Sequence, residues 1–148
     1  MRRGRGLILA GLAGAWFAAA TVEGQEPAAK RSARDGVYSE RQAGRGRRVY
    51  GRSCEHCHGA SLEGSEPREI PALVFEPFMR QWNGRTVAEL FEHVSRSMPA
   101  DDRGSLTPRA YGDVVAFVLE SNGFPAGSSD LPEKPEELAA ITIERLQR

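Results

Sequence analysis

Both cysteines of this 148-residue chain lie in one five-residue run, Cys54-Glu55-His56-Cys57-His58. The Cys-x-x-Cys-His spacing places two thiols within one helical turn, where each can add across one vinyl group of a haem. The histidine that follows is then held below the ring, where its imidazole nitrogen can ligate the iron. The motif therefore predicts one covalently attached haem c, with thioethers to Cys54 and Cys57 and with His58 as an iron ligand.

Three other kinds of site could use the same residues. A structural zinc site takes four cysteine or histidine ligands from two separated clusters, and here only His93 could supply the second cluster. A thioredoxin-like pair follows a strand in an alternating strand-helix chain, and the sequence shows no such alternation. A disulfide between Cys54 and Cys57 would close too small a loop to stabilise the fold appreciably. Haem attachment is therefore the preferred interpretation.

Residues 1–20 have the pattern of a secretory signal peptide. Three arginines precede an uncharged apolar stretch from Leu7 to Ala20 that ends in small residues, and Gly24 offers a second cut site. The stretch is shorter than the about 20 residues of a membrane-spanning helix, although a retained anchor stays an alternative. Cleavage after Ala20 removes three arginines from a chain of zero net charge and leaves −3, without the basic excess of a nucleic-acid binder. We expect export to the periplasm.

The next segments differ in their helical signals. Residues 21–37 carry no apolar period and are expected to form a disordered leader. Ser39 and Gln42 form a capping-box pair that predicts a helix to about Ser53, although three glycines in this stretch disfavour a helix locally. The interval 59–81 is interrupted by glycines and prolines, so we expect a long loop that wraps around the cofactor.

The second half of the chain predicts two further helices. Thr86 and Glu89 form a capping box for the first of them, which should stop at Pro99. Thr107 should cap the other, which carries a regular apolar stripe and should end at Asn122-Gly123. Residues 128–148 form a C-terminal extension with a candidate short amphipathic helix over 136–147. No part of the sequence predicts a strand.

Gly46 and Tyr50 precede Cys54 by eight and four residues, and a Met-Pro step follows at Met98. With these features, residues 38–127 resemble a class I, or mitochondrial-type, cytochrome c domain. The resemblance implies an all-α cytochrome c fold, with three to four helices and long loops around one covalently attached haem. It also implies that the C-terminal helix crosses the first helix at Gly46, which would lie against Ala116 and Phe117.

Four shorter segments are similar to those of small cytochromes associated with bacterial quinoprotein (PQQ) dehydrogenases. These segments are Trp82-Asn83-Gly84-Arg85-Thr86, Met98-Pro99, Gly104-Ser105-Leu106 and Asn122-Gly123-Phe124-Pro125.

The candidates for the sixth iron ligand are Met79, Met98, His56, His93 or none. The resemblance favours Met98, because it follows a helix well downstream of His58 as the family's axial methionine does. A thioether ligand stabilises ferrous iron and raises the reduction potential. The alternative explanation for Met79 is a place in the core of the loop, and His93 is better explained as a solvated side chain.

The resemblance also suggests which residues support the cofactor. The backbone carbonyl of Pro71 should accept a hydrogen bond from His58, which would fix the orientation of the imidazole. Trp82 and Arg85 are candidates to bind the haem propionates, because buried carboxylates need donors. Alternatively, Trp82 packs in the hydrophobic core without contacting the haem, and the Arg85 side chain is solvated.

Taken together, these features predict an electron carrier rather than an enzyme. The resemblance implies a dehydrogenase, such as a quinoprotein dehydrogenase, as electron donor and a terminal oxidase or another cytochrome as acceptor. The protein could act as a free carrier or as the electron-transfer subunit of a dehydrogenase. The alternative is a haem-based sensor or enzyme with an open iron position, for which the only acidic residues just after Met98 are Asp101 and Asp102.

Overall fold

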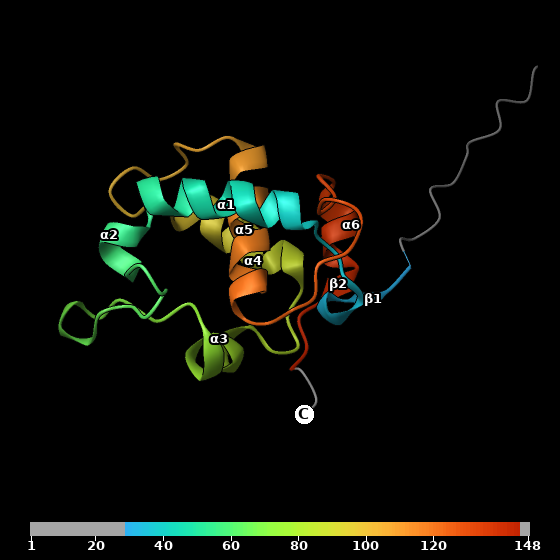
Figure 1. The fold of residues 1–148 in the computed structure, drawn as a ribbon, viewed down its shortest axis with the longest axis horizontal. Coiled ribbons are helices and arrows are strands. Elements are labelled where there is room, and N and C mark those ends of the chain that lie inside the picture. The colour runs from blue at the N-terminus through green and yellow to red at the C-terminus, as the bar shows by residue number, and fades with distance from the viewer. Residues whose placement is uncertain (1–28, 146–148) are drawn as a thin grey trace, which may run out of the picture.

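The computed structural model describes residues 29–145, and its architecture is mainly helical (Figure 1). The predicted signal peptide, both candidate cut sites and residues 21–28 of the expected leader lie outside this range. In chain order the elements are β1 (Arg31–Ser32), α1 (Glu40–Ser53), α2 (Glu55–His58), α3 (Phe75–Trp82), α4 (Val87–Ser97), α5 (Pro108–Ser121), α6 (Pro135–Ala139) and β2 (Ile141–Thr142). Short 3-10 turns occupy Ala33–Asp35 and Glu66–Arg68. None of the described helices combines the length and apolar character needed to cross a membrane.

Helix α1 begins where the sequence predicts, at the Ser39 cap. The Ser39 hydroxyl accepts a hydrogen bond from the backbone N–H of Gln42. The expected capping box is nevertheless incomplete, because the Gln42 side chain does not return to the cap. Its Oε1 instead accepts from the backbone N–H of Leu131 at 2.7 Å. Gln42 therefore joins α1 to the C-terminal extension.

The three glycines of α1 are explained in part by its crossing with α5 (Figure 1). A Cβ atom on Gly46 would lie 1.8 Å from the carbonyl oxygen of Asp113 and 2.9 Å from Cβ of Phe117. One turn later, the rings of Tyr50 and Phe117 pack with their centroids 5.3 Å apart. The expected contact with Phe117 is confirmed, but Asp113 rather than Ala116 supplies the closest atoms. Close helix packing here outweighs the low helix propensity of glycine.

The expectation of a loop over 59–81 is wrong in its last third, where α3 runs from Phe75 to Trp82. Pro77 stands in the first turn of α3, where a backbone N–H has no intrahelical partner and its absence costs little. Phe78, Met79 and Trp82 are buried on the inner side of the helix. The eight-residue helix is therefore stabilised mainly by burial of one apolar side. The prolines and glycines before it hide this helical pattern in the sequence.

Helices α4 and α5 follow their predicted signals closely. The side chains and backbones of Thr86 and Glu89 form the reciprocal capping box of α4. The Thr107 hydroxyl accepts from the backbone N–H of Ala110 and caps α5, with Pro108 in the first helical position. Leu119 and its apolar neighbours on α5 are buried in the main core.

The expected disordered leader is wrong for the described part of that segment. Strand β1 pairs in parallel with β2, with Arg31 opposite Ile141 and Ser32 opposite Thr142. Ala33 and Val37 are buried in the same core as Ile141. The sequence of this segment shows no apolar period, and its order depends on contacts with distant parts of the chain, such as β2. The expectation of no strand is wrong for the same reason.

The C-terminal extension is likewise an integral part of the core. Its helix α6 is shorter than expected, because the chain leaves the helix after Ala139 and enters β2. Beyond β2, the backbone of Ile143 accepts from the N–H of Gly84 at 2.7 Å and donates to the carbonyl of Arg85 at 2.8 Å. The extension therefore holds the connection between α3 and α4, two helices that border the cavity described below.

A second tie between α1, α5 and the extension is ionic. The Arg45 guanidinium donates to both carboxylate oxygens of Asp113, at 3.0 and 2.8 Å, and to Asp130 at 2.7 Å. The Asp113 side chain is only 6% exposed. Hydrogen bonds from Ser39 and Arg45 lower the pKa of Asp130 below its ordinary value. Because the Asp113 side chain is buried, its negative charge depends on Arg45 for compensation.

We expect Arg45→Ala to lower the free energy of unfolding by about 2–3 kcal/mol, because it leaves the buried Asp113 carboxylate without its cation. This is below the about 3–5 kcal/mol of a fully buried pair, since Arg45 is partly solvated. The matched control is Arg96→Ala, which breaks the exposed pair with Glu92 and should cost at most about 0.5 kcal/mol. Urea unfolding followed by circular dichroism checks both values. Equal losses in the two variants would contradict the prediction.

Candidate functional site

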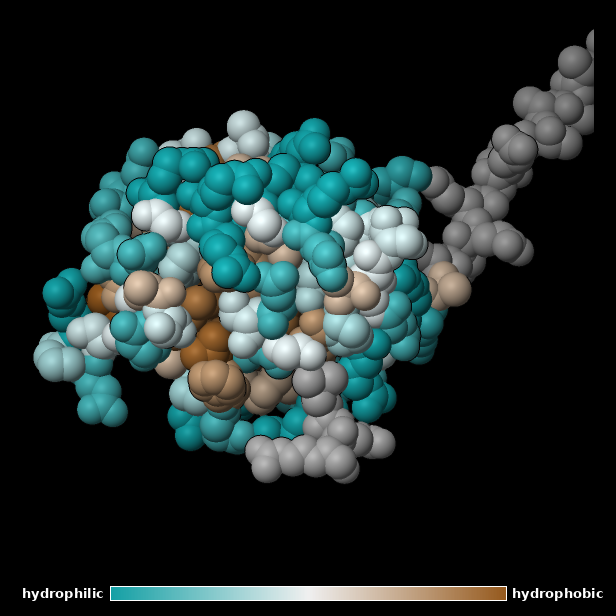
Figure 2. All heavy atoms as spheres, viewed as in Figure 1, coloured by the Kyte–Doolittle hydropathy of each residue, from teal (hydrophilic) through white to brown (hydrophobic). Residues whose placement is uncertain are grey.

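A cavity of about 370 Å³ lies between α2, α3, α4 and α5. Its volume is in the range of cofactor pockets, and its walls are mainly apolar. The face shown in Figure 2 has hydrophobic surface between α1 and α3, whereas the outward side of α1 is hydrophilic. The lining residues are Tyr50, Ser53, Cys54, His56, Cys57, His58, Glu69, Ile70, Pro71, Leu73, Phe78, Gln81, Trp82, Leu90, His93, Val94, Met98, Pro99, Ala100, Asp101, Val114 and Val118.

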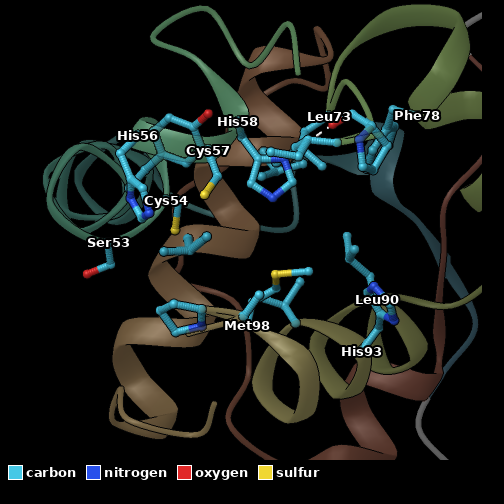
Figure 3. Close-up of a pocket in the computed structure, with 18 of the residues that line it drawn as sticks. Ser53, Cys54, His56, Cys57, His58, Leu73, Phe78, Leu90, His93 and Met98 are labelled. Carbon is cyan, nitrogen blue, oxygen red and sulfur yellow. Dashed lines mark hydrogen bonds between the residues drawn. The ribbon is translucent and has the colours of Figure 1, made fainter. Parts of the chain in front are cut away.

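The predicted attachment motif forms one end of this cavity. Helix α1 ends at Ser53, and the one-turn helix α2 then presents Cys57 and His58 beside Cys54 (Figure 3). Both cysteines are free thiols, so they do not form the disulfide considered as an alternative. Burial raises the pKa of the Cys54 thiol to about 11, and the neighbouring Cys57 adds to this increase. A redox-active thiol pair needs a lowered pKa instead, which argues against a thioredoxin-like site.

The zinc alternative also lacks support in residues 29–145. Within this range, no three side chains of histidine, cysteine, aspartate or glutamate converge as metal ligands. His93, the residue that would complete such a site, lies on the far side of the cavity from the two cysteines (Figure 3).

The imidazole of His58 is held in one orientation. Its Nδ1 lies 3.2 Å from the carbonyl oxygen of Pro71, so the hydrogen bond expected from the sequence is present. Burial lowers the pKa of His58 below its ordinary value, which favours the neutral ring. With Nδ1 donating to Pro71, the lone pair of Nε2 is free to bind a metal. The ring projects into the cavity in Figure 3.

The loop that carries Pro71 is brought close by Gly64. This glycine has φ +72°, and a Cβ atom there would lie 2.4 Å from the carbonyl oxygen of Ile70. Its backbone N–H donates to the carbonyl of His58 at 2.8 Å. A glycine is therefore needed at this position to place the Pro71 carbonyl beside His58.

Met98 forms the opposite wall. It is the residue directly after α4, and its backbone N–H still donates to the carbonyl of Val94. Figure 3 shows the thioether of Met98 across the cavity from the ring of His58. Met79, by contrast, is buried in the core and is not among the cavity-lining residues. Of the two methionines considered as ligands, the structure brings only Met98 to the site.

The two other histidines occupy the rim. His56 is exposed and lies 4.0 Å from the carboxylate of Asp101, near the cysteine end. His93 is exposed to solvent, as expected, but it also borders the cavity, and its ring centroid lies 5.5 Å from that of Trp82. The sequence suggested the solvated position of His93 but gave no sign that it also contacts Trp82.

Trp82 and Arg85 take different positions. Trp82 is buried and lines the cavity, but Arg85 is not among the lining residues. The Arg85 guanidinium stacks 4.8 Å from the Trp82 ring centroid and pairs with Glu89 at 3.0 Å. The propionate-binding role of Arg85 stays a prediction. Of the two residues, only Trp82 lines the cavity.

A polar contact at Met98 has no signal in the sequence. Tyr111 belongs to the apolar stripe of α5, and its hydroxyl donates to the carbonyl oxygen of Met98 at 2.8 Å. No local signal identifies this bond, because the donor and the acceptor are brought together only when α5 folds back onto the end of α4.

The donor set fits the cofactor that the motif predicts. Two thiols stand at one end of an apolar cavity, and imidazole and thioether groups face each other across it. Haem c requires thiols for its two vinyl groups and nitrogen or sulfur donors on the two faces of the iron. The apolar walls suit the macrocycle, whose burial would complete the core of a small domain.

Comparison with known proteins agrees with this geometry. Residues 41–118, more than half of the chain, match the family model described as cytochrome c oxidase, cbb3-type, subunit III. The crystal structure of the sulfane dehydrogenase SoxCD from Paracoccus pantotrophus is similar, with a TM-score of 0.49 and 20% sequence identity. That match covers 79% of this chain and 60% of the other. The search of curated proteins found no match. Because the family model matches more than half of the chain, the protein belongs to the cytochrome c oxidase cbb3-type subunit III family, as a class I c-type cytochrome, an electron-transfer protein with covalently bound haem c.

Proposed function

We propose that this protein is a periplasmic electron carrier with a single haem, attached through Cys54 and Cys57 and ligated by His58 and Met98. The observation that carries the proposal is the arrangement in Figure 3, where the imidazole and the thioether face each other across one apolar cavity. The single Cys-x-x-Cys-His motif supports one haem per chain.

The haem supplies an iron that gains and loses one electron. The residues of this chain determine how easily that happens. The hydrogen bond to Pro71 holds the His58 ring, so its Nε2 would need no reorientation if the charge of a bound iron changed. Met98 provides a soft sulfur donor, which stabilises ferrous iron and raises the reduction potential. The apolar side chains of Leu90, Val114 and their neighbours exclude water from the same space.

The alternative function, a sensor or enzyme with an open iron position, has less support. Such a site needs a distal position that is free for a small ligand. Here Met98 extends toward that position, and of the two nearby acids only Asp101 borders the cavity, where it faces His56 at the rim.

The proposed partners are other redox proteins. The family name, which refers to a subunit of cbb3-type cytochrome c oxidase, supports a respiratory acceptor. The sequence resemblance to cytochromes associated with quinoprotein dehydrogenases supports such an enzyme as donor. Phe75 is 74% exposed and lies two residues after Leu73, which lines the cavity. Among the described residues Phe75 is the one large hydrophobic side chain that is exposed, and aromatic side chains are enriched at protein interfaces.

The test is to produce the full chain in a bacterial host that exports proteins and attaches haem c. We expect the intact mass of the product to exceed that of the processed polypeptide by one haem. The ferric form should show the weak red-edge absorption of a sulfur-to-iron bond. Export is measured separately, by fractionating the periplasm and sequencing the mature N-terminus, and retention in the cytoplasm would contradict the proposed location. A product without covalent haem would overturn the proposal.

The partner is tested by stopped-flow mixing of the oxidised cytochrome with a reduced quinoprotein dehydrogenase. We expect haem reduction to be faster than with an unrelated periplasmic electron donor of similar potential. Equal rates with the two donors would remove the dehydrogenase as partner while leaving the electron carrier intact.

A further inference from the structure

One tyrosine hydroxyl joins both ends of the loop that follows Met98. Tyr111 stands in the first turn of α5 and is only 3% exposed. Its hydroxyl donates to the carbonyl oxygen of Met98 at 2.8 Å and accepts from the backbone N–H of Leu106 at 3.4 Å. The two contacts close the loop 99–105 onto the start of α5.

The loop itself has few other attachments in the described structure. Residues 100–105 are all exposed, and a Cβ atom on Gly104 would meet nothing within 4 Å. Two turn bonds lie inside the loop, from Asp102 N–H to Pro99 at 3.1 Å and from Ser105 N–H to Asp102 at 3.3 Å. Leu106 packs against the core at its far end. The backbone N–H of Met98 is held by Val94 of α4 at 3.0 Å, and the Asp101 carboxylate lies 4.0 Å from His56. The Tyr111 hydroxyl adds the link from the Met98 carbonyl to α5.

We propose that Tyr111 is the positioning residue that keeps Met98 over the iron, and that it sets how readily another ligand replaces the thioether. This inference rests on the proposed ligation by Met98. Replacement breaks the bond between iron and sulfur and forms one between iron and the incoming atom, with no electron transferred. The backbone of Met98 moves outward when its side chain leaves, and the bond to Tyr111 opposes that movement.

The test uses Tyr111→Phe, which removes one oxygen atom and keeps the buried ring. The ferric holoprotein is titrated with imidazole, and the loss of the red-edge absorption is followed. We expect imidazole to bind about three- to tenfold more tightly to the variant, the effect of losing one hydrogen bond that holds the competing ligand. The haem stays covalently bound in both proteins.

Tyr38→Phe is the matched control. Tyr38 is 1% exposed and also donates its hydroxyl to a backbone carbonyl, that of Phe124, but it does not line the cavity. Its loss should reduce stability by a similar amount, measured by thermal unfolding, while imidazole affinity stays within about twofold of wild type because the two sites are independent.

Each outcome decides the inference. Tighter imidazole binding in Tyr111→Phe alone supports the positioning role. Unchanged imidazole affinity in Tyr111→Phe, or an equal change of affinity in both variants, overturns the positioning role. Neither result contradicts the ligation by Met98. A wild-type ferric spectrum without the sulfur-to-iron absorption overturns the ligation itself, and with it the role of Tyr111.

Discussion

Met98→Ala is expected to free the sixth coordination position while the haem stays attached. The ferric form should lose its red-edge absorption, become at least partly high-spin and bind external ligands such as imidazole. Its reduction potential should fall by at least about 0.1 V, a modest part of the about 0.8 V range that axial ligands span in haem proteins. Optical spectra of both oxidation states and a potentiometric titration provide these measurements.

Met79→Ala is the control, because it removes the same side chain from the core rather than from the cavity. We expect it to lower the free energy of unfolding by about 2–5 kcal/mol, as for other buried methionines, with an unchanged spectrum. The opposite pattern, with the absorption lost in Met79→Ala and kept in Met98→Ala, would move the ligand to Met79 and contradict the site described above.

Gly46→Ala should be strongly destabilising although Gly46 does not line the cavity. The new methyl group would lie 1.8 Å from the carbonyl oxygen of Asp113, which belongs to the backbone of α5 and cannot rotate away. The two helices have to separate, so we expect a loss of about 3 kcal/mol or more. This corresponds to a fall in melting temperature on the order of 10 °C, measured by circular dichroism.

Gly44→Ala tests whether the effect comes from the helix crossing. Gly44 lies in the same helix, but a Cβ atom there would meet nothing within 4 Å. Alanine has the higher helix propensity, so this variant should gain about 0.5–1 kcal/mol. A similar loss of stability in both variants would show that α1 tolerates no replacement of glycine. The contact between α1 and α5 would then not be the cause.

The parts of the site that the sequence predicts are those whose chemistry is local. The two cysteines and His58 lie within five residues, so one turn of helix brings them together in any fold. The caps at Ser39, Thr86 and Thr107 act on backbone groups three residues away, and all three helices begin where these signals place them. The approach of the C-terminal helix to Gly46 also followed from the sequence, through the family resemblance.

Tertiary structure decided the contacts between segments far apart in the chain. Trp82 and Arg85 are both candidates for the cofactor in the sequence, but in the fold only Trp82 lines the cavity, and the Arg85 guanidinium packs on its ring. Tyr111 reaches the carbonyl of Met98 only because α5 packs back along α4.

In the fold, too, local features follow from the sequence, whereas contacts between distant segments do not. By itself, the sequence determined the haem motif, the starts of the main helices and the all-α class, because each depends on residues within one or two turns. Whether Arg31 and Ser32 form a strand depends on Ile141 and Thr142, which supply the missing hydrogen-bond partners. Helix α3 likewise requires a core to cover Phe78. These features were decided by the tertiary structure, because their stabilising contacts come from parts of the chain that no local pattern connects.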